Sequence, residues 1–141
     1  MGINGLLLNL KSIGVRRHVS EYGGMRVGID GYSWLHKALH TCGVDVAVNQ
    51  NLHKFVRYFE HKLQYLISCN VKVLVVFDGD KLPLKLSTET SRHQNRQKCY
   101  AMAMEFYKKG NIEEANKLFS QAIDISPSMA RFVKQKIEAK F

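Results

Sequence analysis

Two aspartates each end a run of residues that is typical of a buried β-strand. Asp30 ends the alternating part of MRVGIDGY, and Asp78 follows the aliphatic run of VKVLVVFDG. A rigid sheet could hold two such carboxylates together, and carboxylate oxygens are ligands that hard divalent cations such as Mg²⁺ prefer. Either aspartate alone could instead begin an Asx-turn or cap the helix that follows it.

A second group of side chains has the chemistry to bind phosphate. Lys85, Arg92 and Arg96 belong to a basic segment, residues 84–110, and over the whole chain Lys and Arg outnumber Asp and Glu by 21 to 12, for a net charge of +9. A basic domain favours a polyanionic partner such as nucleic acid. Arg92 and Arg96 are four residues apart and share a helix face, which could equally be a solvated surface.

Hydrophobic periodicity predicts the elements that must position these groups. Ser33 is the expected cap of the second helix, and residues 43–51 are expected to form a loop. The predicted order is helix, strand, helix, helix, strand, over residues 4–13, 25–32, 33–42, 52–69 and 71–79.

This order predicts an α/β fold, a parallel sheet with helices on both faces. A strand–helix–strand unit of this spacing suggests a right-handed parallel crossover, and a nearly continuous aliphatic strand is typical of a sheet covered on both sides. Ligands of open parallel sheets bind beyond the carboxyl ends of the strands. If the two strands are neighbours, Asp30 and Asp78 converge at one rim.

The C-terminal third predicts two further helices. Asn111 can cap the first of them, with Glu114 three residues later, and Ser126 followed by Pro127 is a typical start for the last one. The stretch also has the spacing of half a tetratricopeptide unit. Such repeats need about three copies to bury a core, and the sequence contains one.

Other features exclude several classes of protein. The cysteines are Cys42, Cys69 and Cys99, which form no CxxC pair and argue against a disulfide framework or a zinc site. No apolar run approaches the roughly 20 residues that span a bilayer, so we expect no membrane partner.

The chain resembles the flap endonuclease/XPG family of structure-specific 5′ nucleases. The matching stretches are MGINGLL, ID followed by YSWLHK, VFDG followed by LPLK, SRHQNR, and GNIEEANKLFSQAIDISPSMA. The resemblance implies a PIN-like nuclease core that is incomplete here, with a helical arch. Residues 1–99 are expected to be the N-terminal nuclease region, and residues 100–141 the rest of the arch and the start of a connection to a further nuclease block.

The resemblance implies a Mg²⁺-dependent 5′→3′ DNA exonuclease or flap endonuclease that acts on 5′ ends or flaps in DNA repair, in the nucleus. Asp30 and Asp78 match ligands of a site for two Mg²⁺ ions, which assist phosphodiester hydrolysis. Lys85 and Arg92 match the basic pair that reaches the scissile phosphate from the arch.

Three further residues take roles from the same resemblance. Gly2 matches a catalytic-site residue whose backbone lies against the active site after removal of Met1. His36 matches the residue that stacks on the terminal base of the DNA, and Arg96 matches a phosphate contact. No role follows for Asp80, and mismatch-repair or clamp proteins as partners cannot be read from the sequence.

The resemblance also implies that most metal-binding acids lie in a block patterned like EADAQ, expected after Phe141. We therefore expect the 141-residue chain to hold half of an active site and to be inactive and only marginally stable alone, as a fragment, a truncated product or the product of a degenerate gene. The alternatives are a non-catalytic DNA-binding module and a tetratricopeptide-like helical interaction domain.

Overall fold

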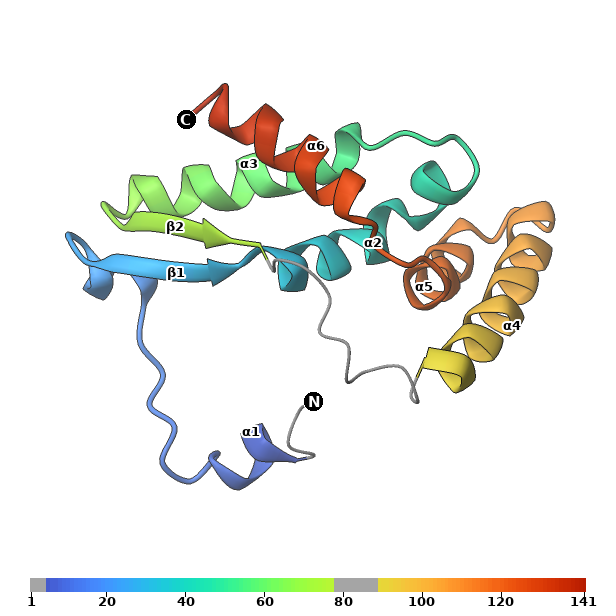
Figure 1. Ribbon diagram of the computed structural model, residues 1–141. Coiled ribbons are helices and arrows are strands. Elements are labelled where there is room, and N and C mark those ends of the chain that lie inside the picture. The colour runs from blue at the N-terminus through green and yellow to red at the C-terminus, as the bar shows by residue number, and fades with distance from the viewer. Residues whose placement is uncertain (1–4, 78–88) are drawn as a thin grey trace.

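The computed structural model describes residues 5–77 and 89–141 (Figure 1). In chain order the elements are α1 (Leu6–Asn9), the short 3₁₀ helix η1 (Val19–Tyr22), β1 (Arg26–Asp30), α2 (Gly31–Ala47), α3 (His53–Ser68), β2 (Lys72–Val76), α4 (Glu89–Lys108), α5 (Ile112–Ala122) and α6 (Pro127–Glu138). Apart from the short 3₁₀ helix η1, the first five elements follow the predicted order of helix, strand, helix, helix, strand, although the first helix covers only Leu6–Asn9 of the predicted residues 4–13.

The two strands form a parallel pair, which confirms the predicted α/β class. Their register pairs Arg26 with Lys72 at one end and Asp30 with Val76 at the other. Parallel neighbours need a long crossover, and α2 and α3 supply it. Asp30 therefore lies at the carboxyl edge of the pair, as predicted.

Within the described residues, the helices cover one face of the sheet. Val73 and Val75 point to the face that packs against the main core, whereas Leu74 and Val76 are 64% and 52% exposed. Alternation of this kind follows from the period of two along a strand. The outer face of β2 therefore carries two exposed aliphatic side chains beside Lys72.

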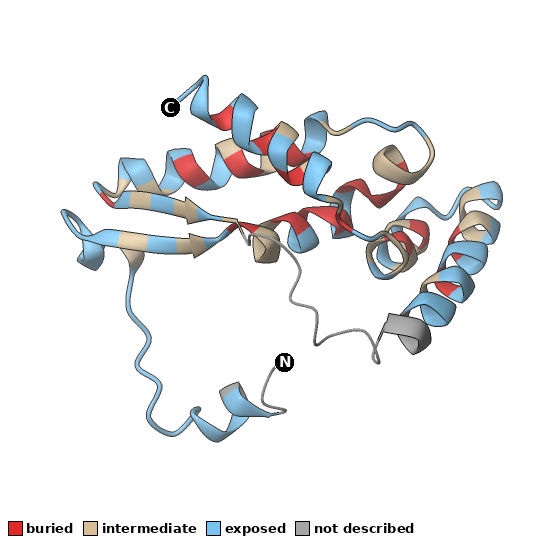
Figure 2. Cartoon of the chain, viewed as in Figure 1, coloured by how far each residue is buried: buried red, intermediate tan, exposed pale blue. Residues whose placement is uncertain are grey.

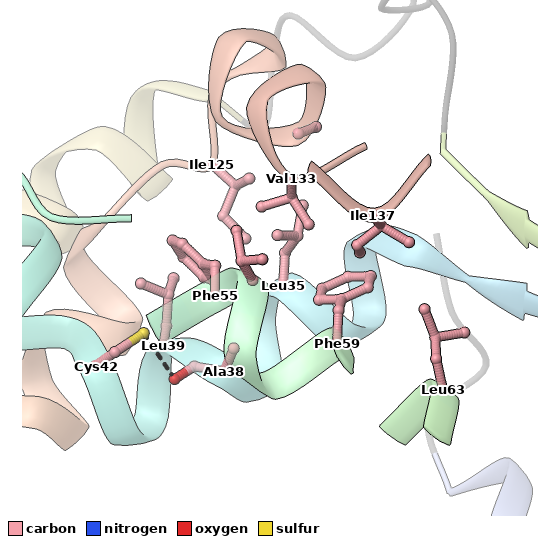
Figure 3. Close-up of a cluster of buried hydrophobic side chains, with 12 residues drawn as sticks. Leu35, Ala38, Leu39, Cys42, Phe55, Phe59, Leu63, Ile125, Val133 and Ile137 are labelled. Carbon is pink, nitrogen blue, oxygen red and sulfur yellow. Dashed lines mark hydrogen bonds between the residues drawn. The ribbon is translucent and has the colours of Figure 1, made fainter. Parts of the chain in front are cut away.

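The buried side chains form two clusters. The main core lies between α2, α3 and α6, with Phe55 and Phe59 fully buried in it (Figure 3). A smaller cluster, the hairpin core, joins the end of α2 to α4 and α5 through Val44, Ala103, Ala115 and Phe119. Helix α2 is the element that contributes to both, as the line of buried residues along it in Figure 2 shows.

The start and the end of α2 differ from the prediction. The cap is Asp30 and not Ser33, because the Asp30 side chain accepts a hydrogen bond from the Ser33 backbone. The predicted loop at residues 43–51 is also wrong over its first half. The helix bends at Cys42, where φ is −129°, and then continues to Ala47 because Val44 packs into the hairpin core.

The predicted caps of the last two helices are confirmed, although the Glu114 side chain pairs with Lys117 and not with the Asn111 backbone. Asn111 caps α5 by accepting a hydrogen bond from the Glu114 N–H at 3.2 Å, and Ser126 caps α6 with Pro127 at its first position. Gly110 ends the turn before α5 with a positive φ of 78°. In the part of the chain that the structure describes, no helix is both long and apolar enough to span a membrane.

Candidate functional site

Asp30 is an exposed carboxylate at the junction of β1 and α2. Its Oδ1 accepts a hydrogen bond from the Ser33 N–H at 3.0 Å, so the helix-cap interpretation of this residue is realised. The cap also fixes the direction of the carboxylate, because the first turn of α2 holds it. A carboxylate has a second oxygen and further lone pairs, so capping leaves it able to bind a cation.

The neighbours of the two predicted acids touch each other. Gly31, directly after Asp30, packs so closely on Phe77 that a Cβ at residue 31 would lie 2.6 Å from the Phe77 ring. Phe77 is the residue directly before Asp78. Phe77 is held in turn by Tyr32 and Phe59, at ring-centroid distances of 6.2 and 6.1 Å. The chain is therefore brought together at the positions next to both acids, although Asp78 itself lies outside the described residues.

Two of the predicted DNA-binding residues, His36 and Arg96, are described. His36 is exposed on α2, six residues after Asp30, which places it about 9 Å farther along the helix axis. Arg96 lies in α4 and its side chain is 29% exposed.

The structure does not describe the other predicted site residues in full. Gly2, Asp78 and Lys85 lie outside the described residues, and for Arg92 only the backbone, in α4, is described. Their roles remain predictions.

Arg96 has a partner that the sequence did not indicate. Its Nη1 lies 3.1 Å from Oδ2 of Asp124, in the connection between α5 and α6. This ion pair ties the basic helix to a segment 28 positions later in the chain. A pair so distant in sequence leaves no local signal.

The placement of α4 relative to Asp30 depends on contacts between α5 and α2. Oδ1 of Asn116 accepts a hydrogen bond from the Val44 N–H at 2.8 Å, just past the bend of α2. Gly43 allows this approach, since a Cβ there would lie 2.8 Å from Cβ of Phe119. Asn is a weak helix former, so its presence inside a predicted helix is the one signal that could have marked this residue.

Cys42 is not suited to a chemical role. Its side chain is fully buried and donates a hydrogen bond to the Ala38 carbonyl at 3.1 Å (Figure 3). Burial first, and the nearby Asp45 second, raise the pKa of this thiol to about 12, against a smaller opposite effect of Lys54. The reactive and metal-binding form of cysteine is the thiolate, which Cys42 does not form near neutral pH.

The described residues fit a metal only in part. Asp30 offers the oxygen chemistry that Mg²⁺ prefers, but near-octahedral Mg²⁺ needs more oxygens than one side chain supplies. Over residues 5–77 and 89–141 there is no group of three or more His, Cys, Asp or Glu side chains placed to hold an ion. Waters, substrate oxygens and acids beyond these ranges would have to complete the shell.

Known proteins match this chain over most of its length. Residues 1–99 match the model of the XPG N-terminal domain. The chain is 41% identical over 130 residues to exodeoxyribonuclease 1 of Schizosaccharomyces pombe and 41% identical over 130 residues to exonuclease 1 of Arabidopsis thaliana. It is also 36% identical over 133 residues to the DNA damage-inducible protein DIN7 of Saccharomyces cerevisiae.

These alignments cover most of this chain and a small part of each relative. They include 92%, 92% and 94% of the chain, but 23%, 18% and 31% of the three relatives. The chain thus spans less than a third of the length of these proteins. The family predicted from the sequence is confirmed for this N-terminal part.

Proposed function

Because the chain belongs to the XPG N-terminal domain family, we propose that it is the N-terminal portion of a structure-specific 5′→3′ DNA exonuclease or flap endonuclease that acts in DNA repair in the nucleus. The names of two relatives, exodeoxyribonuclease 1 and exonuclease 1, support the reaction class, and the name of DIN7 supports the link to DNA damage. The substrate class is DNA with 5′ ends or flaps.

The parallel pair of strands is the observation that carries this proposal. Asp30 ends β1, and Gly31 touches Phe77, the residue that precedes Asp78. Asp30 and Asp78 would hold Mg²⁺, which when bound activates water and stabilises the leaving oxygen in phosphodiester hydrolysis. Asp30 contributes an exposed carboxylate whose direction its hydrogen bond to Ser33 fixes.

The remaining proposed roles belong to phosphate and base recognition. Lys85 and Arg92 would act on the scissile phosphate, with the backbone of Gly2 against the same site. The exposed ring of His36 would stack on the terminal base, an interaction worth about 1–3 kcal/mol per base. Arg96 would bind a phosphate of the DNA backbone.

A second candidate function is a DNA-binding module that does not cleave. The observation in its favour is that Asp30 is the one proposed metal ligand within the described residues, in a chain of net charge +9. Both candidates bind DNA, and they differ in whether Mg²⁺ leads to hydrolysis.

The test measures binding of the 141-residue chain to a labelled 5′-flap DNA and to a blunt duplex of equal length, by fluorescence anisotropy between 50 and 200 mM salt. We expect the flap to bind more tightly, and log K to fall with log salt by about 0.9 for each phosphate neutralised. Arg92→Ala should weaken binding more than Arg131→Ala, a matched change on an exposed residue of α6.

The outcomes separate the candidates. Cleavage of the flap by this chain with Mg²⁺ would rule out the non-cleaving module and our expectation that the chain is inactive alone. Binding that is independent of salt and of DNA structure would overturn the proposed function.

A further inference from the structure

We propose that Asp124 is the counter-ion of Arg96 in the DNA-free chain. When DNA binds, a phosphate replaces the Asp124 carboxylate at the Arg96 guanidinium. The inference rests on the proposed function, because it takes Arg96 as a phosphate contact. It goes beyond that function in assigning an acidic residue outside the basic helix a part in setting DNA affinity.

The geometry provides the contact. Nη1 of Arg96 and Oδ2 of Asp124 are 3.1 Å apart, and both side chains reach solvent, with exposed fractions of 29% for Arg96 and 55% for Asp124. A guanidinium has five N–H donors, more than one carboxylate can use. A phosphate arriving from solvent therefore finds donors on Arg96 while the ion pair is still formed.

The position of Arg96 makes the exchange relevant to DNA. It lies four residues after Arg92 in α4, so the two residues are on the same side of the helix. Asp124 comes from another part of the fold, between the end of α5 at Ala122 and the cap of α6 at Ser126. Its carboxylate is thus fixed next to the helix that the proposed function directs at the DNA backbone.

The energetics favour replacement of the carboxylate by phosphate. An ion pair that reaches solvent, as this one does, gains little free energy, because water screens it and two side chains must be ordered. DNA presents a dense row of phosphates, and each neutralised phosphate releases counterions. Asp124 therefore cannot retain Arg96 against DNA at low salt, but the exchange lowers the net gain of binding. Asp124 makes the affinity lower and its salt dependence shallower than the basic helix alone would give.

The experiment measures the dissociation constant of the 141-residue chain for a 5′-flap DNA over a salt series. Asp124→Asn should bind about two- to fivefold more tightly at low salt, the range expected for release from a partly exposed pair, with a salt slope steeper by up to about 0.9. Asp124→Ser is measured as well, so that a folding defect of one variant does not decide the result.

Two controls identify the cause. Glu138→Gln changes the net charge equally, but it breaks an exposed pair with Lys134 near the far end of α6, at the opposite side of the molecule from α4 (Figure 1). It should change affinity by less than about 1.5-fold, because distant charges are screened. In an Arg96→Ala background, Asp124→Asn should have no effect, since there is no guanidinium to release.

The proposal fails if Asp124→Asn matches Glu138→Gln, or if its gain persists without the Arg96 side chain, while the wild type still binds with a steep salt dependence. Absence of salt-dependent binding by the wild type would instead overturn the proposed function. The two failures are therefore distinguishable.

Discussion

Asp30 combines a structural task with a proposed chemical one. Its Oδ1 caps α2 through the Ser33 N–H, and its exposed position at the carboxyl edge of the strands suits a metal ligand. The two tasks can be separated, because a serine can cap a helix but offers no carboxylate.

Asp30→Ser should unfold at nearly the same denaturant concentration as the wild type, whereas Asp30→Ala should lose about 1 kcal/mol through loss of the cap. With Mn²⁺ as a probe of the Mg²⁺ site, the amide resonances of residues 31–33 should broaden in the wild type and in neither variant. Asp45→Ser, a matched change elsewhere on α2, should keep the broadening. Broadening that survives in Asp30→Ser would exclude Asp30 as a ligand.

The sequence predicts the positions of some of these residues but not their long-range contacts. The position of Asp30 could be read from it because a strand pattern stops there. The partner of Arg96 and the contact of Gly31 with Phe77 could not be read from it, because only the folded backbone brings these residues together. The first pair is 28 positions apart in the chain and the second is 46 positions apart.

Among the helices, α2 shows where propensity gives way to packing. Residues 43–47 resemble a loop locally, with a glycine and two β-branched residues. They remain helical because Val44 is buried against α5 and because the Asn116 side chain accepts a hydrogen bond from the Val44 N–H. Helices α5 and α6 were easier to predict, since their caps, Asn111 and Ser126, are local features of the sequence.

Asn116→Ala should lower the free energy of unfolding by about 1–2 kcal/mol, because it leaves the buried Val44 N–H without this acceptor. Asn116→Asp keeps an acceptor oxygen at the same place and should retain more of the stability. Urea denaturation followed by circular dichroism measures both. A loss as large for Asp as for Ala would show that the hydrogen bond to Val44 is not what Asn116 contributes.

The described helices cover one side of the sheet, and the other side leaves Leu74 and Val76 exposed beside Arg26, Asp30 and Lys72. The prediction of a parallel α/β core is confirmed; helices were predicted on both faces, and the described helices cover the face that carries Val73 and Val75. Both faces of β2 carry aliphatic residues, and Val75 differs from Leu74 only in what packs on it.

The contrast between the two environments predicts unequal costs for equal truncations. Leu35→Ala, in the fully buried main core, should cost about 2–5 kcal/mol of unfolding free energy. Leu74→Ala, on the open face, should cost less than about 1 kcal/mol. Equal losses in denaturant titrations at low protein concentration would mean that the outer face of β2 is covered in solution.

Helix α2 runs from the edge of the sheet to the α4–α5 hairpin and shares residues with both hydrophobic clusters (Figure 1). Neither cluster can come apart without exposing part of this helix. Its amide protons should therefore exchange with deuterated solvent far more slowly than those of α1, whose described side chains are all exposed. On heating, the strand edge at Asp30 and the basic helix α4 should then unfold in one step rather than one after the other.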